Sequence, residues 1–254
     1  MMNMHLSEST MNILRNRPLF RENLGRSGAG VWYAGDDLVI KTNAPGTLKR
    51  AYDMHSFLFP SGLSPEALHY ESGETDVLIL RRLEGESAVS KTHLSDPERL
   101  SHALGNEAFR LHAVSAENCP KYYLTNEWNE RFSAKSFDEL EFDPSYSSFL
   151  GITEKDQAYE IAKNGIAHLS QDTVLHGDMC LPNFMLNDFR FTGFIDLGEG
   201  GIGDRHYDLF WAMWSMNYNL KTNKWSEAFL SAYGREKTDM EKIRVFASLV
   251  SLGI

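Results

Sequence analysis

The stretch "VLHGDMCLPNFMLNDFRFTGFIDLG", residues 174–198, places four polar residues at fixed spacings among short apolar runs. His176 and Asp178 follow an apolar pair, and Asn183 comes five residues after Asp178. Thirteen residues after Asn183, an apolar strand ends at Asp196, and a glycine stands two residues further on. This order and spacing predict a catalytic loop, followed by a hairpin whose second strand delivers another carboxylate.

Phosphoryl transfer explains why these residue types occur at these spacings. A carboxylate must lie beside the attacking hydroxyl to orient it and receive its proton, and Asp178 is predicted to be this catalytic base. Oxygen ligands must hold Mg²⁺ against the phosphates, and Asn183 and Asp196 are the predicted metal ligands. His176 is expected to hydrogen-bond near the loop. The spacing is that of the protein-kinase catalytic loop.

A second stretch, "NLGRSGAGVWYAGDDLVIKT" at residues 23–42, predicts a strand, a glycine-rich turn, a strand, a tight turn and a strand. A lysine at the end of such a strand can reach the phosphates of a nucleotide, while glycine amides cover them. The choice between ATP and GTP depends on the backbone at residues 81–84, so either nucleotide is expected. The predicted nucleotide-binding residues are Lys41, Ser27, Gly28, Gly30, Arg82 and Leu83.

The first ninety residues read mostly as strands and the rest mostly as helices, which predicts an α+β protein of two lobes. We place a β-rich nucleotide-binding lobe at residues 1–84 and a larger helical lobe, with the catalytic loop and substrate site, at residues 85–254. The helices are expected near residues 48–58, 97–112, 154–169 and 204–216. Their predicted caps and braces are a Ser95–Glu98 capping box, Thr153, Asp204 and Asp208.

Composition and charge indicate which kinds of ligand the protein can bind and where it acts. The 254 residues include 25 Lys and Arg against 35 Asp and Glu, a net charge of −10. Such a charge disfavours duplex nucleic acid and favours a small cationic ligand. Cys119 and Cys180 form no disulfide framework or zinc pattern, and no signal peptide or membrane span is evident. A cytoplasmic protein that acts as a monomer is therefore expected.

The chain resembles the aminoglycoside 3'-phosphotransferases, whose motif is HGDxxxxN followed by GFIDLGRxGxxDxxxD. The stretches that carry the resemblance are residues 174–209, "GRSGAGVWYAGDDLVIKT" at 25–42, "RLHAVSAENCP" at 110–120 and "AYGREKTDMEKIRVF" at 232–246. The resemblance implies a bilobal protein-kinase-like fold and Mg²⁺-dependent transfer of the γ-phosphate of ATP or GTP to a hydroxyl. It also implies the same roles for Asp178, Asn183, Asp196 and Lys41.

The sequence departs from this family at positions that matter for function. Ala51 stands where the family has a helix glutamate that pairs with the lysine. The nearest acid, Asp53, lies about 200° around the helix and should face another way. Glu199 stands where the family motif has the arginine of Asp-Leu-Gly-Arg. Tyr218 and Asn219 stand where the family has an acidic pair after the aromatic helix, and Val250 and Ser251 stand where it has Asp-Glu near the end of the chain. An acidic stretch, "FDELEFDPSY" at residues 137–146, lies where the family has its substrate loop, and the predicted substrate residues are Asp138, Glu139, Glu141 and Asp143.

These observations favour an aminoglycoside 3'-phosphotransferase over three alternatives. One is a kinase of the same fold that acts on a different small hydroxyl compound. Another is a nucleotide-binding protein with little catalysis, since the helix glutamate is missing. The third, a metallohydrolase using His176, Asp178 and Asp196, is disfavoured because no second histidine cluster has metal-ligand spacing.

Overall fold

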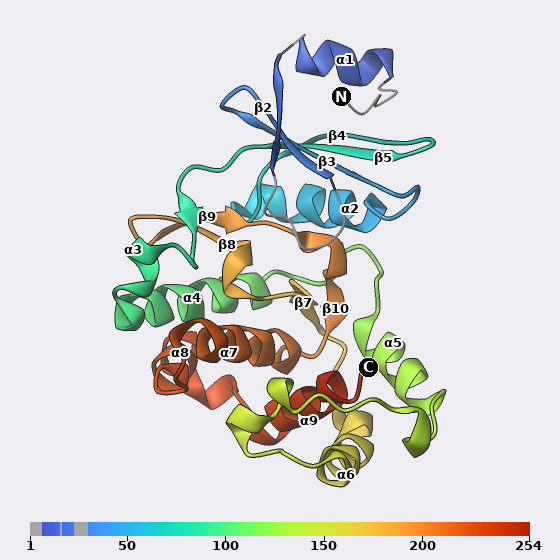
Figure 1. Ribbon diagram of the computed structural model, residues 1–254, viewed down its shortest axis with the longest axis vertical. Coiled ribbons are helices and arrows are strands. Elements are labelled where there is room, and N and C mark those ends of the chain that lie inside the picture. Colours follow the sequence, from blue (N-terminus) through green and yellow to red (C-terminus); the bar gives the residue numbers. More distant parts are fainter. Residues whose placement is uncertain (1–6, 16, 23–29) are drawn as a thin grey trace.

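A five-stranded antiparallel sheet forms the N-terminal lobe of the computed structural model, which describes residues 7–15, 17–22 and 30–254 (Figure 1). The strand order is β1-β2-β3-β5-β4, so consecutive strands are neighbours except where β5 inserts between β3 and β4. The strands are β1 (Leu19–Glu22), β2 (Gly30–Ala34), β3 (Leu38–Asn43), β4 (Ala67–Ser72) and β5 (Asp76–Arg81).

Helices cover both faces of this sheet: α1 (Glu8–Leu14) lies on one and α2 (Lys49–Leu58) on the other (Figure 1). Successive side chains of a strand point to opposite faces, so one strand can pack against both helices. In β5, Val77 and Ile79 pack in the cluster that includes the α1 residue Leu14. Leu78 and Leu80 pack with the α2 residue Ala51. The inner strand β5 is therefore buried on both sides, and its apolar residues need no alternation with polar ones.

The catalytic stretch lies between two small sheets in the middle of the molecule (Figure 1). One pairs β7 (Thr173–Leu175) with β10 (Gly201–Gly203), and the other has the order β6-β8-β9. Residues 176–183 connect β7 to β8, and Asp196 follows β9. The remaining strands are β6 (Glu86–Ser87), β8 (Phe184–Asn187) and β9 (Arg190–Phe194).

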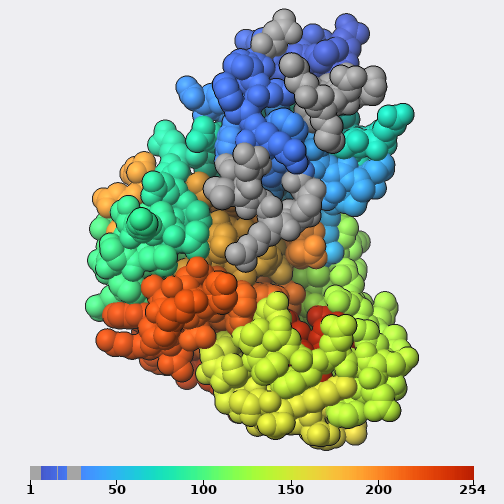
Figure 2. All heavy atoms as spheres, in the orientation of Figure 1, coloured from blue at the N-terminus to red at the C-terminus, as the bar shows by residue number. Residues whose placement is uncertain are grey.

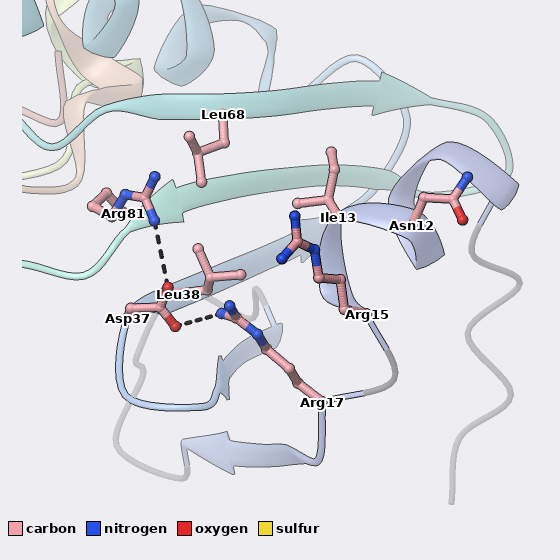
Figure 3. A pocket seen from close by; sticks show the side chains of 8 residues that line it. All are labelled: Asn12, Ile13, Arg15, Arg17, Asp37, Leu38, Leu68 and Arg81. Atoms are coloured by element: carbon pink, nitrogen blue, oxygen red, sulfur yellow. Dashed lines mark hydrogen bonds and ion pairs between the residues drawn. The ribbon is translucent and has the colours of Figure 1, made fainter.

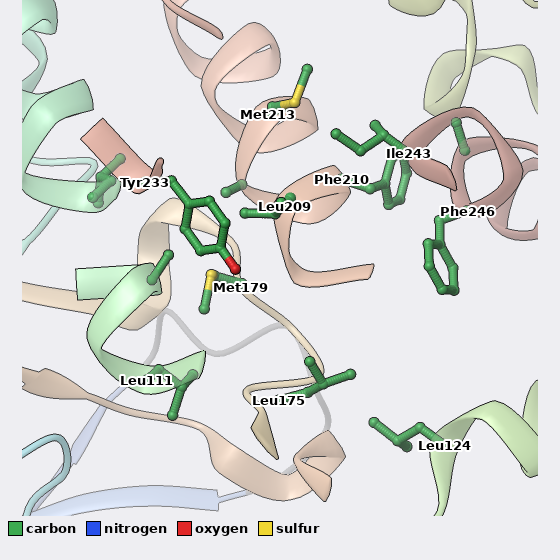
Figure 4. Close-up of a cluster of buried hydrophobic side chains, with 14 of the residues drawn as sticks. Leu111, Leu124, Leu175, Met179, Leu209, Phe210, Met213, Tyr233, Ile243 and Phe246 are labelled. Carbon is green, nitrogen blue, oxygen red and sulfur yellow. The ribbon is translucent and has the colours of Figure 1, made fainter. Parts of the chain in front are cut away.

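Helices form most of the C-terminal lobe and enclose one large apolar core, part of which is shown in Figure 4. Met179 of the catalytic stretch is fully buried in this core with Leu209 of α7 and Leu111 of α4, so the loop is anchored by packing. The helices are α3 (Lys91–Leu94), α4 (Pro97–His112), α5 (Leu124–Ser133), α6 (Lys155–Gly165), α7 (His206–Leu220), α8 (Ser226–Tyr233) and α9 (Met240–Ser251). Short 3₁₀ turns are η1 (Phe59–Ser61), η2 (Phe137–Glu139), η3 (Pro144–Tyr146), η4 (Ser148–Leu150), η5 (Ile166–His168), η6 (Leu181–Asn183), η7 (Leu197–Glu199) and η8 (Arg235–Lys237).

The predicted α+β organisation, with a β-rich first lobe and a helical second lobe, is confirmed. The division between residues 84 and 85 stays a prediction. The predicted capping box is wrong: Asp96 caps α4 by accepting the Arg99 N–H at 3.1 Å, while the Ser95 hydroxyl donates to the Thr92 carbonyl. Thr153 is not the cap of α6 either, because that helix begins one residue later, after Glu154. Of the helices in the described ranges, none is long and apolar enough to cross a membrane.

Gly105 sets the distance between α4 and α8, and its replacement tests this packing. A Cβ atom at Gly105 would lie 2.4 Å from the Phe229 carbonyl oxygen and 2.8 Å from the Ala232 Cβ. Gly105→Ala should therefore lower the free energy of unfolding by about 1–3 kcal/mol, because backbone must move. Gly73→Ala is the matched control, since its Cβ would meet nothing within 4 Å. Equal urea midpoints for both variants would contradict this account of the packing.

Candidate active site

Asp208, a fully buried residue in the first turn of α7, holds the catalytic loop by its backbone. Its two carboxylate oxygens accept the N–H groups of His176 at 2.7 Å and Gly177 at 3.0 Å. The imidazole of His112 contacts the same carboxylate at 3.1 Å, and its other ring nitrogen meets the Tyr233 hydroxyl at 2.8 Å. Asp208 therefore braces the catalytic loop, and it is not the cap of α7, whose N-cap residue is Arg205.

Gly177 brings the loop against the segment that follows Asp196. Its φ is +84°, and a Cβ atom there would lie 1.9 Å from the Glu199 carbonyl oxygen. Only glycine combines this backbone conformation with such a close approach. The two halves of the candidate site are therefore in direct backbone contact.

His176 links the same two segments through both ring nitrogens. The Asp178 N–H donates to Nδ1 at 3.2 Å, so the proton must be on Nε2, which donates to the Ile195 carbonyl at 3.0 Å. The Ile195 N–H in turn donates to the Asn183 carbonyl at 3.0 Å. His176 therefore has the structural role expected from the sequence and fixes the residue before Asp196.

The predicted catalytic and metal residues occur as two contacting pairs. The Asn183 side-chain amide donates to the Asp178 carboxylate at 2.9 Å and to the Asp178 carbonyl at 2.8 Å. The Lys41 ammonium, from β3, donates to an Asp196 oxygen at 3.0 Å. This second pair joins the two lobes. Asp178 is half-buried and Asn183 is buried, so the loop presents a carboxylate on a rigid support.

Asp196 suits a role as a metal ligand. Its backbone is left-handed, with φ 63° and ψ 51°, a conformation that aspartate tolerates better than most residues. The Lys41 ammonium lowers the pKa of this carboxyl, so it stays ionised. The side chain is 52% exposed, which leaves it accessible to a ligand.

Asn183 and Asp196 together fit Mg²⁺ when it is bound with phosphate. Both offer the oxygen donors that Mg²⁺ prefers, and this ion is commonly held by one or two carboxylates together with substrate phosphates. The described part of the chain contains no group of three or more His, Cys, Asp or Glu residues that could hold a metal ion by itself.

Two of the other predicted nucleotide-binding residues, Arg82 and Leu83, lie in the connection between β5 and β6. The Arg82 N–H donates to the Asp37 carbonyl at 2.8 Å, and its guanidinium lies 4.7 Å over the Tyr33 ring. The Leu83 side chain packs against Gly193 of β9, where a Cβ atom would lie 2.7 Å away. Gly30 begins β2, opposite Thr42, while Ser27 and Gly28 lie outside the described residues. Their nucleotide-binding roles stay predictions.

The four predicted substrate acids are exposed on one segment of the C-terminal lobe, and two of them also stabilise turns. Glu139 accepts the N–H and the hydroxyl of Ser136, and Asp143 accepts the Ser145 N–H; these hydrogen bonds lower the pKa of both carboxyls. The segment lies beside the end of α9, where the Asp143 N–H donates to the Ser251 carbonyl at 2.8 Å (Figure 2). Asp138 and Glu141 complete the set.

The position of Ala51 shows that α2 directs no carboxylate at Lys41. It is buried against Leu78, the residue paired with Lys41 on the neighbouring strand. Asp53 faces elsewhere, as expected, and accepts the Tyr122 hydroxyl hydrogen at 2.8 Å. Lys41 uses Asp196 as its partner instead.

His55 is a residue of this region that the sequence reasoning missed. It lies one turn after Ala51, on the same side of α2, and is fully buried. Neither ring nitrogen has a hydrogen-bond partner among the described residues. Burial and the Lys41 charge lower its pKa to about 3. The four-residue spacing from Ala51 was the available signal.

A pocket of about 490 Å³ lies elsewhere, on the face of the N-terminal sheet next to α1 (Figure 3). Figure 3 shows Arg17 and Arg81 directed toward Asp37, with Arg15 nearby. None of the predicted catalytic, metal or substrate residues lines it. It is not part of the candidate active site.

The candidate site between the two lobes contains a lysine, a catalytic-loop aspartate, an asparagine and an aspartate that follows a strand. This set is typical of a kinase-like phosphotransferase. The model of the "Phosphotransferase enzyme family" matches residues 24–246, and the chain belongs to this family. The protein is 33% identical over 214 residues to a probable aminoglycoside 3'-phosphotransferase of Lactococcus lactis subsp. lactis, covering 83% of this chain and 80% of that one. It is 27% identical to an aminoglycoside 3'-phosphotransferase of Niallia circulans, covering 95% of each. The predicted resemblance is confirmed.

Solved structures show the same fold. An aminoglycoside phosphotransferase of Streptomyces rimosus superposes with a TM-score of 0.71 over 95% of both chains, at 20% identity. The same Streptomyces protein, solved in complex with ADP and streptomycin, gives a TM-score of 0.67 over 91% of this chain and 94% of that one. The predicted bilobal kinase-like fold is thereby confirmed.

The buried His55 should make stability depend on pH. Its folded pKa of about 3 lies below the ordinary value of 6.5, so between these values the unfolded chain binds the extra proton. Stability from this group is complete above pH 6.5 and falls toward pH 3, by up to about 1.4 kcal/mol per pH unit. Without nucleotide or metal, His55→Leu should unfold with a shallower pH dependence between pH 6.5 and 4.7.

Urea unfolding across this pH range measures the effect. His102→Leu, on the exposed side of α4, is the control and should keep the steeper dependence because it retains His55. Parallel curves for His55→Leu and the parent protein would show that the buried imidazole does not resist protonation.

Proposed function

We propose that this protein transfers the γ-phosphate of ATP or GTP to a hydroxyl of an aminoglycoside antibiotic, in a Mg²⁺-dependent reaction. The observation that carries this proposal is the pairing of Lys41 with Asp196 across the lobes at 3.0 Å, beside a loop that holds Asp178 and Asn183 at 2.9 Å. Lysine, base and two oxygen ligands are the set that phosphoryl transfer requires.

Each residue has a role set by its chemistry. Asp178 orients the acceptor hydroxyl and receives its proton as the oxygen attacks the γ-phosphorus, and ADP or GDP leaves as the bond from that phosphorus to the β-phosphate breaks. Lys41 places a positive charge beside the phosphates, and Asn183 and Asp196 would hold Mg²⁺, which would neutralise charge on the phosphates. The hydrogen bond from the Asn183 amide helps to aim the Asp178 carboxylate. Positioning and electrostatics thus supply the catalysis.

Three observations support an aminoglycoside as the acceptor. The relatives from Lactococcus and Niallia carry the name aminoglycoside 3'-phosphotransferase, and the Streptomyces structure contains ADP and streptomycin. The net charge of −10 favours a cationic ligand. The exposed acids Asp138, Glu139, Glu141 and Asp143 can each meet an ammonium group, for about 1 kcal/mol or less per exposed pair.

A second candidate is a kinase of the same fold that acts on a less cationic hydroxyl compound. Glu139 and Asp143 already accept hydrogen bonds within their own segment. Val250, Ser251, Tyr218 and Asn219 stand where the resemblance leads one to expect acids.

The proposed function also includes a location and partners. We propose that the protein is a cytoplasmic monomer that acts on a small molecule and does not bind nucleic acid.

A panel of acceptors distinguishes these candidates. Purified protein, Mg²⁺ and either ATP or GTP would be incubated separately with kanamycin, neomycin and simple amino alcohols, and products would be weighed by mass spectrometry. A gain of one phosphate on kanamycin or neomycin is expected. Phosphate on an amino alcohol alone would favour the second candidate.

Asp178→Asn tests the base directly. The variant should retain the fold and nucleotide affinity, because an asparagine oxygen can still accept the Asn183 hydrogen bond. Its kcat should fall about 10²–10⁴-fold, the usual worth of a positioned acid–base group. Full activity of this variant would exclude Asp178 as the base.

A further inference from the structure

Arg50 ties α2 to the segment that follows Asp196. Its Nε donates to the Gly200 carbonyl at 2.6 Å, and its Nη2 donates to the Glu199 carbonyl at 3.4 Å. The arginine side chain is only 18% exposed, and it also approaches Glu127 of α5 at 3.6 Å. One residue of the N-terminal lobe therefore holds the backbone three to four residues beyond a predicted metal ligand.

Tyr122 completes this connection from the C-terminal lobe. The Arg50 guanidinium lies 4.6 Å over its ring, and its hydroxyl donates to Asp53 at 2.8 Å. Arg50 and Asp53 are three residues apart on α2, so they present one face of the helix to Tyr122. The Tyr122 carbonyl accepts the Ile202 N–H at 2.7 Å. Three segments, α2, the stretch before α5 and residues 199–202, thus meet at one tyrosine.

The glycines of this segment are shaped for the arginine. A Cβ atom at Gly201 would lie 2.4 Å from the Tyr122 carbonyl oxygen and 3.1 Å from the Arg50 Nη2. A Cβ atom at Gly200 would lie 3.1 Å from the end of Met54, also on α2. A side chain at Gly201 would clash with the Tyr122 backbone, and one at either position would displace the end of the Arg50 or Met54 side chain. The close contact of α2 with residues 199–201 is therefore built into the sequence on both sides.

We propose that Arg50, supported by Tyr122 and Asp53, is a positioning residue that aligns α2 and the Asp196 segment. It takes the place of a link from α2 to Lys41, for which Ala51 provides no carboxylate. Lys41 then reaches Asp196 directly, and Arg50 holds the backbone after Asp196 from the same helix. The inference rests on the proposed function in one respect: the aligned group acts in phosphoryl transfer.

The fork of the arginine is essential to this role. Two nitrogens donate to two successive carbonyls while the plane stacks on the tyrosine ring, and lysine cannot reproduce either feature. Arg50→Lys should therefore restore only part of what Arg50→Met loses. A role in charge alone would make the lysine variant equal to the parent protein.

Hydrogen exchange of the full-length protein tests the link without relying on activity. In Arg50→Met, amides of residues 197–203 should exchange roughly 10- to 100-fold faster, because charge-assisted hydrogen bonds hold this segment. Arg99→Met is the matched control: Arg99 also stacks on a ring, that of Phe189 at 4.3 Å, and donates to a carbonyl, that of Asp188 at 3.2 Å, but on the β8–β9 turn. It should leave exchange at residues 197–203 unchanged. Unchanged exchange in Arg50→Met would overturn the proposal.

Kinetics then separate positioning from stability. The folded Arg50→Met enzyme should lose about 10- to 100-fold in kcat, while its nucleotide Kd changes by less than about threefold. Faster exchange with an unchanged kcat would also overturn the positioning role. If the parent protein phosphorylates no acceptor, the proposed function fails, and the exchange measurement alone still decides whether Arg50 holds the segment.

Discussion

The buried carboxylate of Asp208 supports the rest of the active site. Each of its oxygens accepts one backbone N–H of the catalytic loop, and His112 contacts it from α4. A buried charge is tolerated only when its hydrogen-bonding capacity is met, so the loop cannot leave without a large cost. The directions of Asp178 and Asn183 follow from a loop held in this way, because only a few residues separate them from the brace.

The arrangement of the candidate catalytic residues could be predicted because their geometry is local. Asp178 and Asn183 lie five residues apart on one loop, and Asp196 ends the hairpin that follows, so spacing alone placed them together. The brace could not be predicted, since 96 residues separate His112 from Asp208 and 121 separate it from Tyr233. The sequence indicated the missing carboxylate at Ala51 but carried no sign that Arg50 would turn toward Gly200, 150 residues away.

The lobes are joined here by contacts that differ from the lysine–glutamate pair of the resembling family. Lys41 meets Asp196 without help from α2, and the helix reaches the same segment through Arg50. Both links end on residues 196–200, so this short stretch is bonded to the N-terminal lobe at two points, one from β3 and one from α2. The pattern explains why the loss of a helix carboxylate is compatible with an assembled site.

The contact of Gly177 with the Glu199 carbonyl, described above as a consequence of glycine geometry, also bears on how this chain can diverge. Where backbone touches backbone, the distance between the two segments is set by the main chain and not by the size of a side chain. The acidic segment at residues 137–146 has no such protection, because its predicted contacts with a ligand are made by exposed side chains. Substitutions in that segment would therefore change the proposed acceptor contacts without moving the backbone of the catalytic loop.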